Sequence, residues 1–301
     1  MARKRKGDAV SGVLLLDKPA GASSNHALQQ VKRLLNAAKA GHGGTLDPMA
    51  TGLLPLLFGE ATKFSSDLLD ADKRYDAWVK LGVRTDTADA DGAVLETRPV
   101  SSTRAEIESA ASRFVGDILQ VPPMVSALKR DGKPLYAYAR AGIALAREAR
   151  PVRIARLEVG EIEGDRFRLA VECSKGTYVR TLAEDIGQVL GCGAHLAALV
   201  RTRVGALKLE DAVTLAALEA MTPDARRAVL LPVDALLQGL PKVALGERQA
   251  TLFLHGGQID LGGAPGLKRV YGPTDELLGT AEMDDRGQLN PRRLIAVAAD
   301  A

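Results

Sequence analysis

The chain has 301 residues, of which 46% are hydrophobic and 26% charged, a balance that is ordinary for a folded protein of about two domains. Its 30 glycines and 14 prolines are too few for a collagen-like or low-complexity chain, and its two cysteines, Cys173 and Cys192, are too few for a disulfide framework or a four-cysteine zinc site. The net charge of +3 is small, so its distribution along the chain is more informative than its size.

The N-terminal residues give no sign of a membrane or export signal. Met1 to Lys6 are basic, but the apolar run that follows, Val13 to Leu16, ends at Asp17. A secretory signal needs ~7–15 apolar residues and a membrane helix ~18 or more. The sequence therefore predicts a cytoplasmic protein without a membrane segment.

Positive charge is concentrated in two segments. Residues 1–40 carry eight Lys and Arg against two acids, and residues 126–156 again carry eight against two, whereas residues 60–110 hold eleven acids and seven bases. Two basic segments on a nearly neutral chain indicate a polyanion that follows particular surfaces. A solvated tail and a charged helix face would give the same distribution, and charge alone leaves both interpretations open.

Three elements are predicted in the first hundred residues. Residues 13–16 form an apolar run typical of a buried strand, which we expect to end in a turn at residues 17–19 because Pro19 cannot continue a central strand. Residues 27–38 place their apolar side chains on one helical face. Residues 75–83 alternate between apolar and polar side chains, as a half-buried strand does.

Three further elements follow. Thr103 and Glu106 have the spacing of a capping box and predict a helix that includes Phe114. Residues 167–173 alternate again as a strand, and residues 182–190 follow a helical period that a glycine ends. No internal repeat is visible.

The pattern changes after Leu240 and Pro241, where short apolar runs alternate with glycine-rich turns. That pattern is typical of a small all-β unit. We therefore predict a boundary near residue 240, with one domain over residues 1–240 and a second over residues 241–301.

The most unusual stretch is residues 41–55, GHGGTLDPMATGLLP, in which four glycines and two prolines constrain the backbone of a loop. Pro48 restricts Asp47 to an extended backbone, which projects its carboxylate. Local physics alone favours a plain turn here, because Asp-Pro is a common turn starter. His42 has no His or Cys partner at a metal-binding spacing.

A second cluster, residues 173–182, lies where a predicted strand meets the next helix. Gly176 turns the chain, and Tyr178 and Arg180 stand at the start of that helix. An arginine in this place can pair with a buried carboxylate or merely cap a surface helix, and its position alone leaves both open.

The motif His42 to Pro48, HGGTLDP, closely resembles the nucleophile motif of the bacterial tRNA pseudouridine-55 synthases, the TruB family. Further blocks resemble the same family in the same order, over nearly the whole chain. These blocks are residues 12–19, 72–75, 84–92, 174–180, 191–196 and 199–201.

The resemblance implies an α+β fold in which helices flank a mixed, largely antiparallel sheet, the pseudouridine synthase fold. It implies that residues 1–240 form the catalytic domain, and that residues of about 122–152 within it form a mobile thumb that closes over RNA. Residues 241–301 resemble, more weakly, the small RNA-binding barrel called PUA.

Three residues correspond to the catalytic group of the family. The resemblance implies that Asp47 is the nucleophile and that Arg180 is its partner. It implies that Tyr75 stacks on the target base and is implicated in removing a proton from the C5 atom of that base.

Further residues are implied in substrate binding or in support of the site. His42 corresponds to the residue that enters the RNA where the target nucleotide has left, and Tyr178 and Leu199 to residues that line the pocket. Lys18, together with Pro19, corresponds to a pair that supports the site.

The implied activity is the isomerisation of uridine 55 in the T loop of tRNA to pseudouridine, after the uridine has flipped out of the stack. The implied partner is tRNA through its T arm, and no cofactor or metal is expected. We expect a monomer, because no exposed apolar stripe in the sequence favours a second subunit.

Two other hypotheses stay open. An RNA-binding or tRNA-folding protein with a vestigial catalytic loop would need the basic segments, but not Asp47, Tyr75 and Arg180 together. A hydrolase of small glycosides would need a second carboxylate beside the first. The motif around Asp47 offers none, and the pattern of the acids in residues 67–72 is typical of a solvated face.

Overall fold

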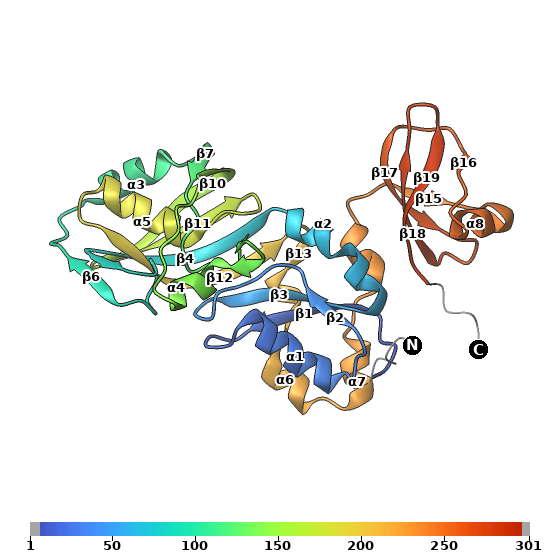
Figure 1. Cartoon of the computed structure of the whole chain (residues 1–301), viewed down its shortest axis with the longest axis horizontal. Coiled ribbons are helices and arrows are strands. Elements are labelled where there is room, and N and C mark those ends of the chain that lie inside the picture. The colour runs from blue at the N-terminus through green and yellow to red at the C-terminus, as the bar shows by residue number, and fades with distance from the viewer. Residues whose placement is uncertain (1–6, 297–301) are drawn as a thin grey trace.

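Figure 1 shows the computed structural model of the chain, which describes residues 7–296. A large mixed sheet runs through the main body, and a smaller sheet forms a separate unit near the C-terminus. Arg3 to Lys6, which supply half of the first basic segment, lie outside the described residues.

Within residues 7–296, the large sheet has ten strands, eight of them in one continuous path. The path runs β14 (Val213–Thr214), β1 (Gly12–Lys18), β3 (Thr51–Phe58), β12 (Ala194–Val204), β4 (Lys73–Leu81), β11 (Arg166–Cys173), β10 (Arg150–Glu163) and β7 (Gly116–Gln120). β2 (Ala40–His42) pairs with β3, and β13 (Leu207–Lys208) pairs with β12. Within this sheet the pairs β1–β14 and β3–β12 are parallel and the other described pairs are antiparallel, so the predicted mixed, largely antiparallel sheet is confirmed.

β1 is buried on both faces, which explains its unbroken apolar sequence. Leu14 and Leu16 belong to the main core, whereas Val13 and Leu15 belong to a second core on the other face of the sheet. The sequence predicted the strand correctly but not its full length.

The predicted turn at residues 17–19 is wrong for its first two residues. Asp17 and Lys18 continue β1 and pair with Leu53 and Gly52 of β3. A charged side chain can stay in a buried strand when polar partners satisfy it, and Lys18 has such partners in the adjacent loop.

Helices α1 (Ser24–Leu34), α3 (Arg104–Ser112) and α5 (Val179–Val189) bury apolar faces in the main core. The prediction of helix over 27–38 is wrong at both ends. α1 begins at Ser24 because the Ser23 side chain accepts a hydrogen bond from the His26 N–H, and the helix does not reach residue 38 because Asn36 is left-handed with φ of 48°.

The other predicted elements before residue 240 are found with small shifts of their ends. The capping box at Thr103 is confirmed at the start of α3, and Gly191, with φ of 78°, follows α5. Residues 75–83 are not one strand, because Gly82, with φ of 78°, separates β4 from β5 (Val83–Thr85).

The remaining elements of the main body are short. They are η1 (Gly59–Phe64), α2 (Ser65–Asp70), β6 (Val94–Thr97), β8 (Lys129–Arg130), β9 (Lys133–Pro134), α4 (Leu135–Arg140), η2 (Leu209–Asp211), α6 (Leu215–Ala220), α7 (Pro223–Ala228) and η3 (Val233–Leu237). No helix within residues 7–296 is long and apolar enough to cross a membrane.

The C-terminal unit is built on the sheet β15 (Lys242–Ala244), β17 (Gly266–Tyr271), β18 (Leu277–Met283), β19 (Gln288–Leu294) and β16 (Ile259–Asp260), in that spatial order. It has a core of its own, which includes Val270, Leu278 and Leu289. This sheet confirms the strands of the predicted small all-β unit. The unit is not purely β, however, because α8 (Glu247–Leu254) packs Ala250 and Phe253 into the same core.

The core predicts a measurable difference between two leucines. Leu56 of β3 is fully buried in the main core, whereas Leu95 of β6 is 61% exposed. We expect Leu56→Ala to lower the free energy of unfolding by about 2–5 kcal/mol and Leu95→Ala to change it by no more than about 0.5 kcal/mol. Urea unfolding followed by circular dichroism measures both, and equal losses would contradict this burial.

Candidate active site

The loop between β2 and β3 holds Asp47 in a fixed place. The Ser24 hydroxyl accepts a hydrogen bond from the Leu46 N–H at 2.7 Å and donates one to the Leu46 carbonyl at 2.9 Å. The Gly21 N–H donates to the Pro48 carbonyl at 2.8 Å. The backbone on both sides of Asp47 is therefore bound to the start of α1 and the turn before it, which restricts where the carboxylate can point.

Lys18 supports this loop from behind. Its side chain is fully buried, and Nζ donates to the carbonyls of Pro19 (2.8 Å), Ala22 (2.7 Å) and Pro48 (3.3 Å). Burial lowers the pKa of Lys18 to about 8, although the negative charge of Asp47 opposes that change. The side chain does not line the cavity that Asp47 faces, so its contacts are those of a support rather than of a substrate-binding group.

Arg180, in the first turn of α5, joins Asp47 to the rest of the site. Its side chain is 2% exposed, with Nε 2.9 Å from Asp47 Oδ2 and Nη1 3.4 Å from Asp89 Oδ2. Nη1 also donates to the Thr87 carbonyl at 3.1 Å, and Nη2 donates to the Val125 carbonyl at 2.7 Å. A buried guanidinium with this many oxygen partners has one orientation, and that orientation fixes the ion pair with Asp47.

The charge state of Asp47 depends on this arginine. Burial raises the pKa of the Asp47 carboxyl above its ordinary value, the charge of Arg180 opposes that rise, and the charge of Asp89 adds to it. The side chain is still 32% exposed and faces the cavity. A carboxylate paired on one side and open on the other can act as a nucleophile.

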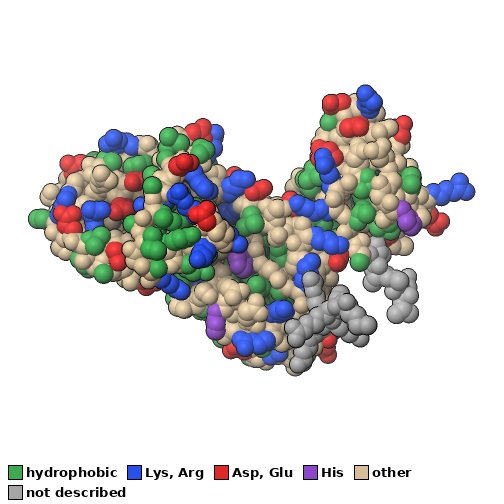
Figure 2. Space-filling model, in the orientation of Figure 1, with side chains coloured by type: hydrophobic (Ala, Val, Ile, Leu, Met, Phe, Trp, Pro, Cys, Tyr) green, Lys and Arg blue, Asp and Glu red, His purple; other side chains and the backbone are tan. Residues whose placement is uncertain are grey.

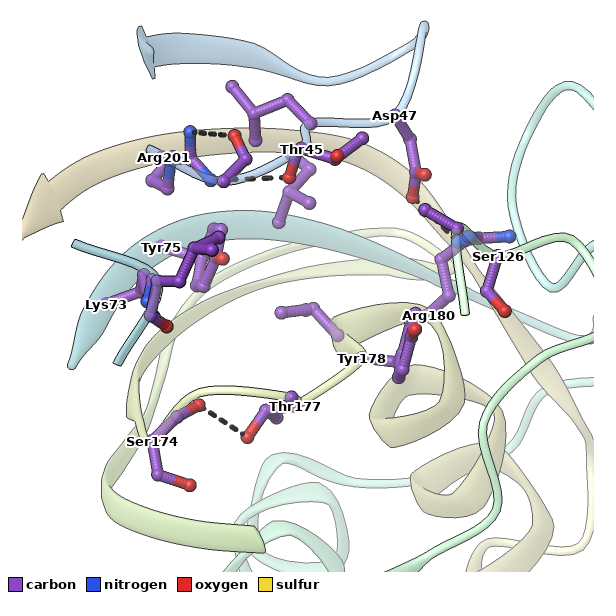
Figure 3. A pocket seen from close by; sticks show the side chains of 17 residues that line it. Thr45, Asp47, Lys73, Tyr75, Ser126, Ser174, Thr177, Tyr178, Arg180 and Arg201 are labelled. Atoms are coloured by element: carbon purple, nitrogen blue, oxygen red, sulfur yellow. Dashed lines mark hydrogen bonds and ion pairs between the residues drawn. The ribbon is translucent and has the colours of Figure 1, made fainter. Parts of the chain in front are cut away.

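Five of the predicted residues share one cavity of about 280 Å³, namely Asp47, Tyr75, Tyr178, Arg180 and Leu199. Figure 3 shows Asp47 pointing toward Arg180, with Tyr75 across the cavity from them and Tyr178 below Arg180. The volume is just below the ~300–1,000 Å³ of small-molecule sites, which suits a single nucleotide more than a longer segment of RNA.

Tyr75 lies on β4, next to a buried arginine that the sequence reasoning did not assign. Arg201 is 1% exposed, lines the cavity and donates to the carbonyls of Leu53 (2.8 Å) and Gly44 (3.2 Å). Burial raises the pKa of the Tyr75 hydroxyl, although the charge of Arg201 opposes the rise. Tyr75 is therefore neutral at neutral pH.

The segment between β7 and β10, residues 121–149, reaches into the same cavity. Ser126 and Ala127 line it, and Val125 supplies the carbonyl that Arg180 binds. Just before this segment, Gln120 is 2% exposed and exchanges two hydrogen bonds with the backbone of Tyr178, at 2.7 and 3.1 Å. The segment that the resemblance identifies as a thumb thus contacts Arg180 through Val125, while Gln120, just before it, holds Tyr178.

His42 does not line the cavity. It ends β2 in a half-buried position, and its Nδ1 atom is buried without a hydrogen-bond partner among the described residues. Burial and the nearby charge of Arg201 lower the pKa of the imidazole, so it is neutral at neutral pH.

Sequence reasoning missed Arg201, Asp89 and Lys73 as parts of the site. Each had a weak signal, because each is a charged residue within an otherwise apolar or turn-forming block, and the structure buries all three. Burial is a property of the folded neighbourhood, so residue type and spacing did not separate them from surface charges. Within residues 7–296, no three His, Cys, Asp or Glu side chains lie close enough to hold a metal ion.

Three family models match consecutive parts of the chain. Residues 32–179 match the TruB family pseudouridylate synthase N-terminal domain, residues 180–238 the tRNA pseudouridylate synthase B C-terminal domain, and residues 241–295 the pseudouridine synthase II TruB C-terminal domain. The chain is 58% identical to a tRNA pseudouridine synthase B of Aromatoleum aromaticum, over 97% of this chain and 95% of that protein. It is also 58% identical to one of Burkholderia mallei, over 99% of this chain and 100% of that protein.

The chain belongs to the TruB family of pseudouridylate synthases. The resemblance described from the sequence is thereby confirmed, and the chain is a pseudouridine synthase, an isomerase. Among solved structures, a Cbf5-Nop10-Gar1 complex contains a chain of similar fold, with a TM-score of 0.73 and 28% identity over 94% of this chain and 84% of that one. An H/ACA RNP bound to a substrate RNA gives the same TM-score at 24% identity, over 99% of this chain and 92% of that one, which supports the fold alone.

The opposing effects of Arg180 and Asp89 predict opposite shifts in pH dependence. Pseudouridine formation should fall as the pH drops through the raised pKa of Asp47. Asp89→Asn removes a charge that raises this pKa, so the acidic limb moves to lower pH. Arg180→Met removes a charge that lowers it, so the limb moves to higher pH and the plateau rate falls by roughly 100-fold.

Single-turnover rates across the acidic range measure both shifts. Asp91→Asn is the matched control, because Asp91 is exposed on the same turn and touches Asp89 only through its backbone N–H. Shifts of both variants in the same direction would contradict the assignment of the limb to Asp47.

Proposed function

We propose that this chain isomerises uridine 55 in the T loop of tRNA to pseudouridine, with Asp47 as the nucleophile. The observation that carries the proposal is the ion pair between Asp47 and Arg180, 2.9 Å long, at the wall of a cavity that Tyr75 also lines. The names of the relatives, tRNA pseudouridine synthase B, support tRNA as the substrate.

The reaction breaks the bond between C1′ of the ribose and N1 of uracil and forms a bond between C1′ and C5. One proton leaves C5 and one is gained at N1, so there is no net change of oxidation state. The Asp47 carboxylate forms a covalent intermediate at C1′ or at C6, and both routes hold the base in the cavity while it turns. Arg180 keeps the nucleophile ionised and directed at the sugar and base.

Tyr75, Tyr178 and Leu199 hold the flipped base. Extrusion of a nucleotide costs a few kcal/mol, and stacking on an aromatic ring returns about 1–3 kcal/mol. Tyr75 lines the cavity across from the ion pair and provides this ring. We further propose that Tyr75 takes part in removing the C5 proton.

Lys18 and His42 act outside the cavity in this proposal. Lys18 keeps the loop of Asp47 in place through the Pro48 carbonyl. The neutral His42 side chain fills the gap that the target nucleotide leaves in the RNA.

The RNA contacts a basic surface that includes the thumb. In Figure 2, Lys and Arg side chains gather in the middle of the face shown and at the junction with the C-terminal unit. The thumb and the strand after it contribute Lys129, Arg130, Lys133, Arg140, Arg147, Arg150 and Arg153. A folded T arm is a suitable substrate, because specific RNA recognition usually targets loops whose bases can be splayed out.

The two domains have different roles. Residues 1–240 carry the chemistry and the thumb, and residues 241–301 form a PUA-like RNA-binding domain. The chain acts as a monomer in the cytoplasm, where its tRNA substrate is found.

The first experiment compares the wild type with Asp47→Asn in single-turnover tritium release from tRNA labelled at C5 of uridine. The exchange keeps the shape of the side chain and removes its nucleophilic charge, so we expect release to fall below detection while RNA binding stays within about threefold. RNA binding without release by the wild type would instead support the hypothesis of an RNA-binding protein with a vestigial loop.

A second experiment tests the thumb as an RNA surface. Replacing Lys129, Arg130 and Lys133 with Gln should weaken binding and flatten the plot of log affinity against log salt by roughly one unit of slope per lost phosphate contact. Arg104→Gln, on the exposed side of α3, is the control for charge alone. An unchanged slope in the triple variant would show that these three thumb residues do not contact RNA phosphates.

A further inference from the structure

The C-terminal unit is joined to the main body through Arg293 of β19. Its Nη1 lies 2.6 Å from Asp67 Oδ2 and its Nη2 donates to the Ser66 hydroxyl at 2.6 Å, both on α2. The guanidinium also lies 5.8 Å from the centre of the Phe64 ring, whose side chain is fully buried. Asp70 and Asp72 are exposed, as the sequence predicts for this face, whereas Asp67 is 33% exposed and pairs with Arg293, more than 200 residues away in the chain.

Two further hydrogen bonds surround this contact. Lys63 Nζ donates to the Leu294 carbonyl at 2.8 Å, and the Ala296 N–H donates to Glu60 Oε2 at 2.7 Å. Lys63 Nζ also donates to Glu60 Oε2, at 2.6 Å. Burial would raise the pKa of Glu60, but the hydrogen bonds from Lys63 and Ala296 and the charge of Lys63 lower it by more. The start of α2 and three residues of η1, Glu60, Lys63 and Phe64, thus contact the end of the C-terminal unit.

The other end of α2 forms part of the active-site cavity. Leu69 lines the cavity, and its carbonyl accepts a hydrogen bond from Lys73 Nζ at 2.7 Å. Lys73 also lines the cavity, is 7% exposed, and binds the Leu68 carbonyl at 2.9 Å. Because Lys73 precedes Tyr75 by two residues on β4, the end of α2 is tied to the strand that presents the stacking tyrosine.

α2 also packs against the loop of the nucleophile. A Cβ atom placed on Gly43 would lie 2.4 Å from Leu68 Cδ1, so a larger residue at position 43 would clash with the helix. Gly43 lies four residues before Asp47. A displacement of α2 therefore acts on two walls of the cavity.

We propose that Arg293 is a positioning residue for catalysis, and that its contact with α2 couples the seating of the C-terminal unit to the rate of the chemical step. The inference rests on the proposed function. α2 has six residues, far fewer than the ~12–15 that an isolated helix needs to be stable, so contacts at its two ends determine where it lies. Arg293 supplies the contact at one end, and Lys73 and Gly43 lie at the other.

A different role for Arg293 would be direct binding of an RNA phosphate. The geometry favours the positioning role, because Asp67, Ser66 and Phe64 already occupy the guanidinium. Arg292 offers a matched control next to it on β19. Its side chain is 62% exposed, and the ion pair that it forms, 3.9 Å long, is with Glu282 and not with α2.

The test compares Arg293→Ala, Asp67→Asn and Arg292→Ala in single-turnover tritium release at saturating RNA. We expect the first two to lower the rate constant by about 10-fold, equivalent to about 1.4 kcal/mol of transition-state stabilisation, with little change in RNA affinity. Arg292→Ala should keep the wild-type rate. The double variant of Arg293 and Asp67 should lose little more than either single variant, because both remove the same contact.

Two outcomes would overturn the proposal. Equal weakening of RNA binding by Arg293→Ala and Arg292→Ala, with unchanged rates at saturation, would make Arg293 an RNA contact. Additive losses in the double variant would mean that Arg293 and Asp67 act separately. If Arg293→Ala unfolds the C-terminal unit, Asp67→Asn decides on its own, because it changes no residue of that unit.

Hydrogen exchange of the free protein gives a readout that does not depend on activity. Arg293→Ala and Asp67→Asn should speed exchange at residues 65–73 and 43–47, and Arg292→Ala should not. Unchanged exchange there would overturn the coupling even in an active enzyme. A wild type that releases no tritium would overturn the proposed function instead, and the exchange experiment would still decide the coupling.

Discussion

The ion pair between Arg180 and Asp47 is the interaction on which the rest of the site depends. Burial disfavours the charged carboxylate and raises the pKa of Asp47, whereas the guanidinium of Arg180 favours the charged form and opposes that rise. Burying an arginine is itself costly unless its donors are satisfied. Asp89 and the carbonyls of Thr87 and Val125 take up its two terminal nitrogens, which means that two more segments, the turn at residues 87–89 and the thumb, must be in place to hold Arg180 beside Asp47.

The order of strands in the sheet explains why these segments meet. β3, β12 and β4 are neighbours, so the loop that precedes β3 lies beside Arg201 of β12 and Tyr75 of β4. Lys18 and Arg201, buried at the centre of this arrangement, donate to backbone carbonyls of the loop that holds Asp47 and thereby position it. The position of Asp47 therefore depends on several buried cations.

The junction with the C-terminal unit also depends on an ion pair. Arg293 neutralises Asp67 and fixes one end of a helix whose other end lines the cavity. A short helix has little stability of its own, so contacts at a distance from the reaction can move it. In this protein the two sheets are linked through α2. Leu68 of this helix packs against Gly43 in the loop before β3, and the Leu69 carbonyl accepts a hydrogen bond from Lys73 of β4.

The sequence by itself determined the family and most of the elements, and it singled out Asp47, Tyr75 and Arg180, which share one cavity. Periodicity, capping and close sequence similarity can all be recognised in consecutive residues. It did not determine where elements end, since Lys18 remains in β1 and α8 forms among glycine-rich turns for reasons of packing. Nor did it reveal the burial of Asp89, Lys73 and Arg201 or the partner of Asp67. Those features depend on contacts between residues far apart in the chain, and only the tertiary structure determines which charged side chains are buried and which of them pair.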